Sequence, residues 1–142
     1  MRRRRGDPRR RAAYAGLLLL TIALGLGWRM LPLGLSPFWF KYGGSGLWAM
    51  ALYWLIAFCF PRYSSVGLAV GAAMVAAVLE FSRLWHLSTL DAFRLTLAGR
   101  LLLGRYFSLK NIVAYWVGIA LAAAMDQWLV RRARLEAKRK AA

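Results

Sequence analysis

The chain has 142 residues, of which 61% are hydrophobic and 14% aromatic, and its mean hydropathy is +0.46. This composition excludes an ordinary soluble domain and predicts a single all-α domain, residues 1–142, that crosses a membrane several times. The formal net charge is +16, but most basic residues lie in two terminal clusters that flank apolar segments. That distribution is typical of membrane topology, and we expect no nucleic-acid partner.

The first predicted span is residues 12–30, behind a basic tail of residues 1–11. Asp7 as N-cap and Pro8 as the first helical residue predict the start of the helix. The apolar run 12–28 is long enough to cross a bilayer. No clear small-x-small cleavage site follows it, so we interpret the segment as a retained anchor and not as a cleaved signal peptide.

The second predicted span is residues 46–60. Before it, prolines and aromatic residues in segment 30–46 predict an interfacial loop that ends in the flexible glycine-rich stretch 43–46. Pro61 ends the span, and the serines that follow can cap the next helix. The second and third spans are therefore expected to form an antiparallel hairpin.

The third predicted span is residues 66–87, whose many glycine and alanine residues allow neighbouring helices to pack closely. Residues 88–91 fit a capping box, which predicts a short helix that begins at Ser88 and ends at Gly99 or Gly104. The apolar part of this helix is too short to span, and we predict an interfacial or re-entrant element.

The fourth predicted span is residues 111–130, which Ser108 can cap and which ends at the basic tail 131–142. Four spans bring both termini to one side of the membrane. Both termini are strongly basic, so the positive-inside rule places them in the cytoplasm. The predicted fold is all-α and polytopic, with four transmembrane helices and one short interfacial or re-entrant helix between the third and the fourth.

Segment 80–105 carries two carboxylates, four arginines and the only histidine of the chain. An ionised side chain at the centre of a bilayer costs roughly 2.5–3.5 kcal/mol, so such residues pair, face a wet cavity or take part in function. Glu80 and Arg83 are three residues apart, as are Asp91 and Arg94, and each pair is expected to meet on a helix face. Two interpretations stay open: internal salt bridges that tolerate burial, or a functional site.

Basic residues outnumber acidic ones at the end of the predicted bundle opposite to the termini. Two carboxylates, Glu80 and Asp91, cannot neutralise this set: Arg29, Lys41, Arg83, Arg94, Arg100, Arg105 and Lys110. The surplus predicts either side chains that extend to water and lipid phosphates, or a cationic pocket for a phosphate or carboxylate group.

The sequence offers little for metal binding or catalysis. His86 and Cys59 are each the only residue of their type, so we expect no metal site, no cofactor and no catalytic residues. Trp48, Tyr53 and Tyr115 are predicted to pack within the spans or to anchor them at the interface, and any of them can line a ligand groove.

Four blocks of sequence have an order and spacing that point to a known family. The blocks are Gly44-x-x-Leu47-Trp48-Ala49-Met50-x-x-Tyr53, Glu80-x-Ser82-x-Leu84, Arg94-x-Thr96-x-x-Gly99-x-Leu101-Leu102-Leu103-Gly104-x-x-Phe107 and Asn111-x-x-Ala114-Tyr115-x-x-Gly118. They resemble the small bacterial membrane proteins of domain-of-unknown-function family 2809. More distantly, they are similar to VanZ-like proteins, which share a membrane Glu followed by an Arg-rich segment and are associated with resistance to glycopeptide antibiotics.

The resemblance implies a multi-pass protein of the bacterial plasma (inner) membrane and directs attention to Glu80, Arg94 and Thr96. It brings no established activity. Three positions depart from the usual pattern of the family: Ser45 replaces Asp, Arg83 replaces Gln and Asn111 replaces Asp.

We therefore predict a protein of the lipid bilayer whose outward-facing pocket binds an anionic lipid headgroup or a lipid-linked envelope precursor. The candidate binding residues are Glu80, Arg83, Asp91, Arg94, Thr96, Trp48, Tyr53, Asn111 and Tyr115. One alternative is a small proton-coupled transporter or channel-like module that uses Glu80 as a titrating carboxylate, which would require a homodimer. A second alternative is a membrane enzyme that acts on lipid-linked substrates.

Overall fold

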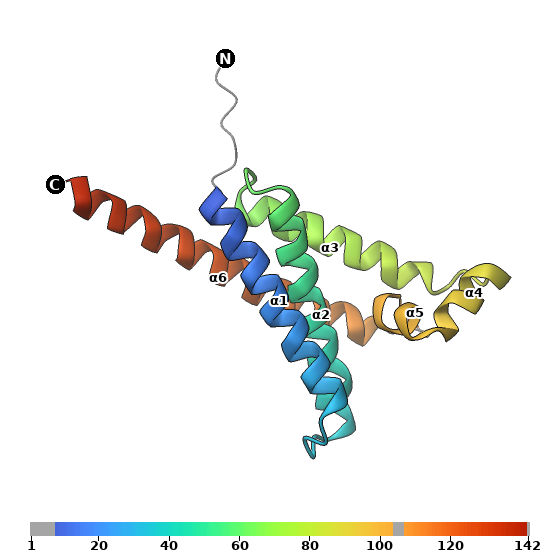
Figure 1. Cartoon of the computed structure of the whole chain (residues 1–142). Helices are drawn as coiled ribbons and strands as arrows, with labels where there is room; N and C mark the ends of the chain where they lie inside the picture. The colour runs from blue at the N-terminus through green and yellow to red at the C-terminus, as the bar shows by residue number, and fades with distance from the viewer. Residues whose placement is uncertain (1–7, 104–106, 142) are drawn as a thin grey trace.

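The computed structural model describes residues 8–103 and 107–141 (Figure 1). Within these residues every regular element is a helix, and four helices are long and apolar enough to cross a membrane. The predicted all-α, polytopic fold is confirmed. The elements in chain order are α1 (Pro8–Met30), α2 (Pro37–Cys59), α3 (Ser65–Ser82), α4 (Ser88–Leu95), α5 (Leu97–Leu102) and α6 (Leu109–Ala141).

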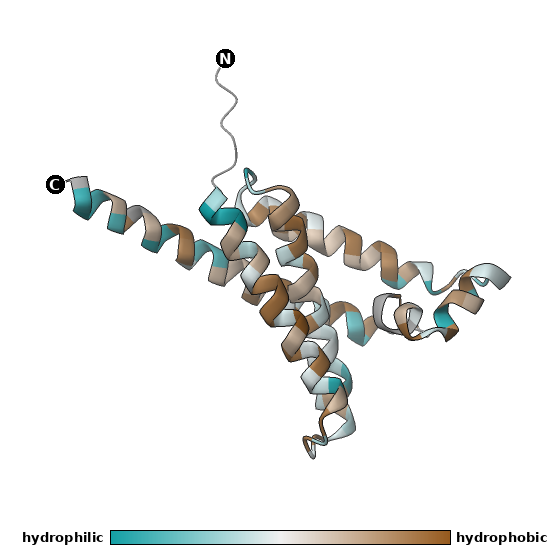
Figure 2. Cartoon of the chain, in the orientation of Figure 1, coloured by the Kyte–Doolittle hydropathy of each residue, from teal (hydrophilic) through white to brown (hydrophobic). Residues whose placement is uncertain are grey.

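The four long helices alternate in direction, so the start of α1 and the last turns of α6 lie at the same end of the bundle (Figure 1). Hydrophobic residues run along all four, and hydrophilic ones gather at the start of α1 and the end of α6 (Figure 2). Helix α1 packs along α2, α2 packs against α6, and α3 packs against α6 and α2. Two short helices, α4 and α5, connect α3 to α6.

Helix α2 begins at Pro37, nine residues before the predicted start of the second span, so the predicted interfacial loop 30–46 is wrong. Proline suits the first turn of a helix because its missing N–H would have no partner there. The glycine-rich stretch 43–46 is helical, and an added Cβ at Gly43 would lie only 2.5 Å from the ring of Trp28. These glycines therefore allow α1 to approach α2 closely, and the connection between the helices is short.

The backbones of α2 and α6 meet at a pair of glycines. An added Cβ at Gly118 of α6 would overlap the carbonyl oxygen of Gly46 of α2. Alanines make up half of the buried hydrophobic core among the described residues: Ala49, Ala57, Ala72, Ala76, Ala122 and Ala123. Small residues let membrane helices approach until their backbones touch, which increases van der Waals contact.

The connection between α3 and α6 differs in detail from the prediction. Helix α3 ends at Ser82, five residues before the predicted end of its span, and α4 begins at Ser88 as predicted. The predicted single helix is broken at Thr96, whose hydroxyl accepts a hydrogen bond from the amide of Gly99 at 3.0 Å and so caps α5. An added Cβ at Gly99 would overlap the carbonyl oxygen of Phe93, so this tight turn requires glycine. The interfacial placement of α4 stays a prediction.

Helix α6 continues to Ala141, beyond the predicted end at Val130. Its 33 residues correspond to about 50 Å at 1.5 Å per residue. The hydrocarbon core of a bilayer is about 30 Å thick, so the last turns extend past it. Basic residues in these turns interact favourably with the helix C-terminus, which explains why the basic tail is helical. The predicted N-cap Asp7 and the basic residue Arg105 lie outside the described residues.

The glycine crossing gives a direct test of the bundle. Gly118→Ala is expected to lower the free energy of unfolding by about 1–3 kcal/mol, because the methyl group forces α2 and α6 apart. Gly71→Ala in α3 is the matched control, since nothing lies within 4 Å of an added Cβ there. Unfolding in detergent micelles, followed by circular dichroism, measures both. Equal stability of the two variants would contradict the close crossing.

Candidate functional site

Asp126 of α6 connects all four spanning helices near the end of the bundle that carries the termini. Its side chain is buried, and it accepts one hydroxyl hydrogen bond from each of the other three helices. Oδ1 accepts from Tyr14 of α1 at 2.8 Å, and Oδ2 accepts from Tyr53 of α2 at 2.9 Å and Ser65 of α3 at 2.6 Å. We call these four residues the Asp126 cluster.

Arg10 supplies positive charge at the edge of the Asp126 cluster. Its Nε donates a hydrogen bond of 2.7 Å to the hydroxyl oxygen of Tyr14, and a terminal nitrogen lies 3.8 Å from Oδ1 of Asp126. A buried carboxylate is tolerated when hydrogen-bond donors and an opposite charge surround it. The arrangement therefore provides the Asp126 carboxylate with hydrogen-bond donors and a nearby positive charge where the four helices meet.

Asp126 was not among the site residues predicted from the sequence, although the sequence contains a signal for it. It is the only acidic residue in the apolar segment 111–130. An ionisable residue inside a membrane span is costly and therefore usually has a functional or structural role. Its partners could not be identified from spacing, because they come from three other helices and lie 61, 73 and 112 residues away in sequence.

Glu80, in the last turn of α3, is the centre of a second buried network at the opposite end of the bundle. Oε1 accepts hydrogen bonds from the backbone amide of Ser108 at 2.8 Å and from Nδ2 of Asn111 at 3.2 Å. Oε2 accepts from the hydroxyl of Tyr115 at 2.8 Å and lies 2.5 Å from a terminal nitrogen of Arg83. The carboxylate thus lies at the N-terminus of α6, where the helix dipole favours negative charge.

Arg83 extends this network to the connection between α5 and α6. It donates to the hydroxyl oxygen of Tyr115 at 3.0 Å and, through Nε, to the backbone carbonyl of Leu103. The predicted pairing of Glu80 with Arg83 is therefore confirmed, and the pair is buried. We call Glu80, Arg83, Asn111 and Tyr115 the Glu80 network.

Arg94 and Asp91 form a separate cluster around the end of α3. The buried guanidinium of Arg94 donates to the backbone carbonyls of Ser82 at 2.7 Å and Trp85 at 2.9 Å, and to Asp91 Oδ1 at 3.0 Å. The predicted Asp91/Arg94 pair is present, and its arginine also binds the backbone carbonyls of the last residue of α3 and of the connection that follows it. The exposed ring of His86 lies 3.4 Å from Asp91 Oδ2.

The structure divides the nine predicted site residues among four places. Asn111 and Tyr115 join Glu80 and Arg83, whereas Asp91 joins Arg94. Thr96 caps α5, and Tyr53 belongs to the Asp126 cluster. Trp48 packs against Tyr115, with ring centroids 5.4 Å apart. Tyr115 and Asp126 are separated by about 17 Å along α6, from 1.5 Å per residue, so the predicted residues do not share one pocket.

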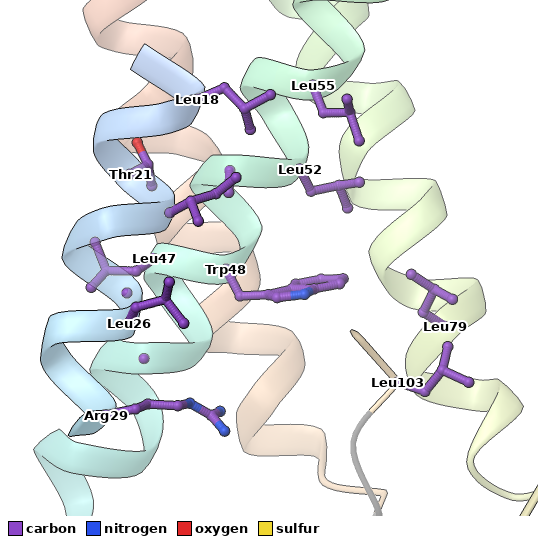
Figure 3. A pocket seen from close by; sticks show the side chains of 14 residues that line it. Leu18, Thr21, Leu26, Arg29, Leu47, Trp48, Leu52, Leu55, Leu79 and Leu103 are labelled. Atoms are coloured by element: carbon purple, nitrogen blue, oxygen red, sulfur yellow. The ribbon is translucent and has the colours of Figure 1, made fainter. Parts of the chain in front are cut away.

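An open apolar groove of about 480 Å³ lies between the α1–α2 pair and α3 (Figure 3). Its volume is within the usual range for ligand sites, roughly 300–1,000 Å³. Trp48 projects from α2 across it towards Leu79 and Leu103, and Arg29 lies at one end (Figure 3). The lining residues are Leu18, Thr21, Ile22, Gly25, Leu26, Arg29, Gly44, Leu47, Trp48, Ala51, Leu52, Leu55, Leu79 and Leu103.

Among the described residues that line the groove, Arg29 is the only charged one, and it is exposed. It makes no hydrogen bond and no ion pair with the residues that the structure describes. The hydroxyl of Thr21 donates to the carbonyl of Leu17 on its own helix at 2.7 Å, so it offers no free donor to a ligand. The groove therefore combines a long apolar surface with one cationic end.

The described residues contain no group of three or more His, Cys, Asp or Glu side chains that could hold a metal ion. The fold and the buried networks define a small multi-pass membrane protein. The chain belongs to the family of proteins of unknown function DUF2809, whose sequence model matches residues 35–119. That range includes the whole Glu80 network but neither Tyr14 nor Asp126. No solved structure matches the chain.

Removal of the Glu80 carboxylate is expected to destabilise the protein strongly. Glu80→Ala leaves the buried guanidinium of Arg83 without its counter-ion, which should cost about 3–5 kcal/mol of unfolding free energy. Glu136→Ala is the control, because its ion pair with Arg132 is exposed and should change stability by less than about 1 kcal/mol. Chemical unfolding in micelles measures both. Similar small losses would show that the Glu80 network does not hold the bundle.

The Asp126 cluster generates a second stability prediction. Tyr53→Phe removes one hydroxyl donor to Asp126 and should cost about 1–2 kcal/mol, because the buried carboxylate loses a hydrogen bond. Tyr63→Phe is the matched control, since Tyr63 is exposed in the loop between α2 and α3. Thermal unfolding in micelles compares the pair. A Tyr53→Phe variant as stable as the control would contradict the role that we assign to the cluster.

Proposed function

We propose that the protein binds an anionic phospholipid of its membrane, with one acyl chain in the groove and the headgroup phosphate at Arg29. The observation that carries this proposal is the open apolar groove that ends at Arg29, an arginine with no hydrogen bond or ion pair among the described residues. A guanidinium binds phosphate through charge-assisted hydrogen bonds, and its place at the end of a spanning helix suits the phosphate layer of a bilayer.

The charge distribution around the groove supports an anionic ligand. The two acids predicted at this end, Glu80 and Asp91, are already paired with arginines. By contrast, Lys41 and Lys110 are exposed, and the Lys41 ammonium lies 5.2 Å from the centroid of the Tyr42 ring. The uncompensated positive charge at this end is complementary to a phosphate group and raises the local concentration of anionic lipids.

The proposed ligand is an anionic lipid, as the sequence suggested, but the proposed site is the groove with Arg29 and not the charged segment 80–105. Arg83 and Arg94, which were predicted to bind the headgroup, donate to internal acceptors. Both oxygens of Glu80 also accept internal hydrogen bonds, which gives no support to its use as a transport carboxylate. The groove differs from these buried networks, because its apolar surface is accessible and Arg29 is exposed.

We also propose that the end with both termini faces the cytoplasm. Helix α1 starts with the basic residues 9–11, and α6 ends with Lys138, Arg139 and Lys140. Basic residues next to spanning helices are retained on the cytoplasmic side. In this orientation Arg29 and the Glu80 network face outwards. The predicted homodimer stays a prediction.

Lipid-resolved native mass spectrometry of the purified protein tests the proposed function. We expect the wild type to retain phosphatidylglycerol in preference to zwitterionic phosphatidylcholine. Arg29→Gln should weaken phosphatidylglycerol binding roughly tenfold, because one charged hydrogen bond contributes about 1.5–3 kcal/mol. Arg62→Gln is the matched control, since Arg62 is an exposed arginine in the loop at the other end of the bundle.

A second pair of variants tests the groove itself. Ala51→Leu fills its interior and should prevent lipid retention, whereas Val70→Leu adds a methylene group to the exposed face of α3 and should not. The proposal is wrong if the wild type retains no phosphatidylglycerol, or if Ala51→Leu binds it as well as the wild type does. Preferential retention of a polyprenyl phosphate would identify a lipid-linked precursor instead of a phospholipid.

A further inference from the structure

The groove has room for a hydrocarbon chain. Its volume is about 480 Å³, and a methylene group occupies nearly the volume of a water molecule, about 30 Å³. One acyl chain of a phospholipid can therefore occupy the groove while the second chain stays in the bilayer.

One wall of the groove is fixed by a buried arginine. Leu103 lies directly after α5, and its side chain lines the groove opposite α1 and α2 (Figure 3). Its backbone amide donates to the carbonyl of Gly99 at 2.9 Å, and its backbone carbonyl accepts the Nε hydrogen bond of Arg83. Arg83 is itself held by Glu80 and Tyr115. The position of Leu103 thus depends on a side chain of α3.

The facing wall rests on the same network. Trp48 lines the groove from α2, and its ring packs against Tyr115. The hydroxyl of Tyr115 donates to Glu80 and accepts from Arg83. Leu79, a third lining residue, directly precedes Glu80 in α3. The Glu80 network therefore sets the spacing between Trp48 on one side and Leu79 and Leu103 on the other.

We propose that Arg83 is a positioning residue that restricts the groove to an unbranched acyl chain. By binding the carbonyl of Leu103, it fixes the wall that lies opposite Trp48, and in the proposed arrangement this fixed wall excludes methyl branches. The consequence is a preference for straight-chain phospholipids and the exclusion of isoprenoid chains, which carry a methyl group on every fourth carbon. This inference rests on the proposed function and specifies its ligand.

The test compares two phosphatidylglycerols with the same headgroup, one with straight palmitoyl chains and one with methyl-branched phytanoyl chains. Native mass spectrometry gives the ratio of their affinities for each variant. The wild type should prefer the straight chain roughly tenfold or more, because a packed hydrophobic pocket discriminates single methyl groups by such factors. Leu103→Ala should reduce the preference to near unity by opening the wall.

Arg83→Lys tests the positioning role without removal of the charge. The ammonium can still pair with Glu80, but it cannot also reproduce the arginine fork that reaches Leu103. We expect the chain preference to fall towards unity while straight-chain affinity changes less than threefold. If this variant does not fold, Leu103→Ala still decides the question, because its side chain takes no part in the Glu80 network.

Tyr53→Phe is the control, since it perturbs the Asp126 cluster and should lower stability without a change in chain preference. The inference is overturned if the wild type binds both lipids equally, or if Arg83→Lys and Leu103→Ala keep the wild-type ratio. In both cases binding that depends on Arg29 would leave the proposed function intact. Failure of the wild type to bind any phosphatidylglycerol would instead contradict the proposed function itself.

Discussion

A carboxylate inside a membrane must find its hydrogen-bond donors within the protein, and two residues of this chain impose that constraint on the whole bundle. Asp126 takes one hydroxyl from each of the other spanning helices, which fixes their relative rotation at one end. Glu80 takes an amide, a side-chain amide and a hydroxyl from the start of α6. Apolar packing between helices is much less specific, because lipid competes for it equally well.

These two requirements account for most of the buried charge among the described residues. Arg83 neutralises Glu80, Arg10 lies against the Asp126 cluster, and Arg94 binds the carbonyls at the end of α3. Arg29 makes no such internal contact with the part of the chain that the structure describes. An arginine adjacent to an open apolar groove is therefore more informative about function than the arginines of the charged segment 80–105, although that segment is the more conspicuous in sequence.

Local features of the sequence predicted the spans and the two acid–arginine pairs. Run length is sufficient to find a spanning helix, and a three-residue spacing places Glu80 beside Arg83 whatever the rest of the chain does. The start of α2 was wrong because glycines were interpreted as flexibility, whereas Gly43 makes room for the Trp28 ring. The grouping of Tyr53 with Asp126 was beyond sequence reasoning, since it depends on how four helices are rotated.

The two networks hold different walls of the groove. Among the described residues, α1 packs on α2 and reaches the rest of the bundle through Tyr14 in the Asp126 cluster. Leu103 and α3 are held at the other end by Arg83 and Glu80. Because α1 does not pack on α3, the Asp126 cluster determines whether the α1–α2 wall is in place, and the Glu80 network determines how closely the opposite wall approaches it. We therefore expect separate substitutions to change the stability of the bundle and the proposed chain selectivity.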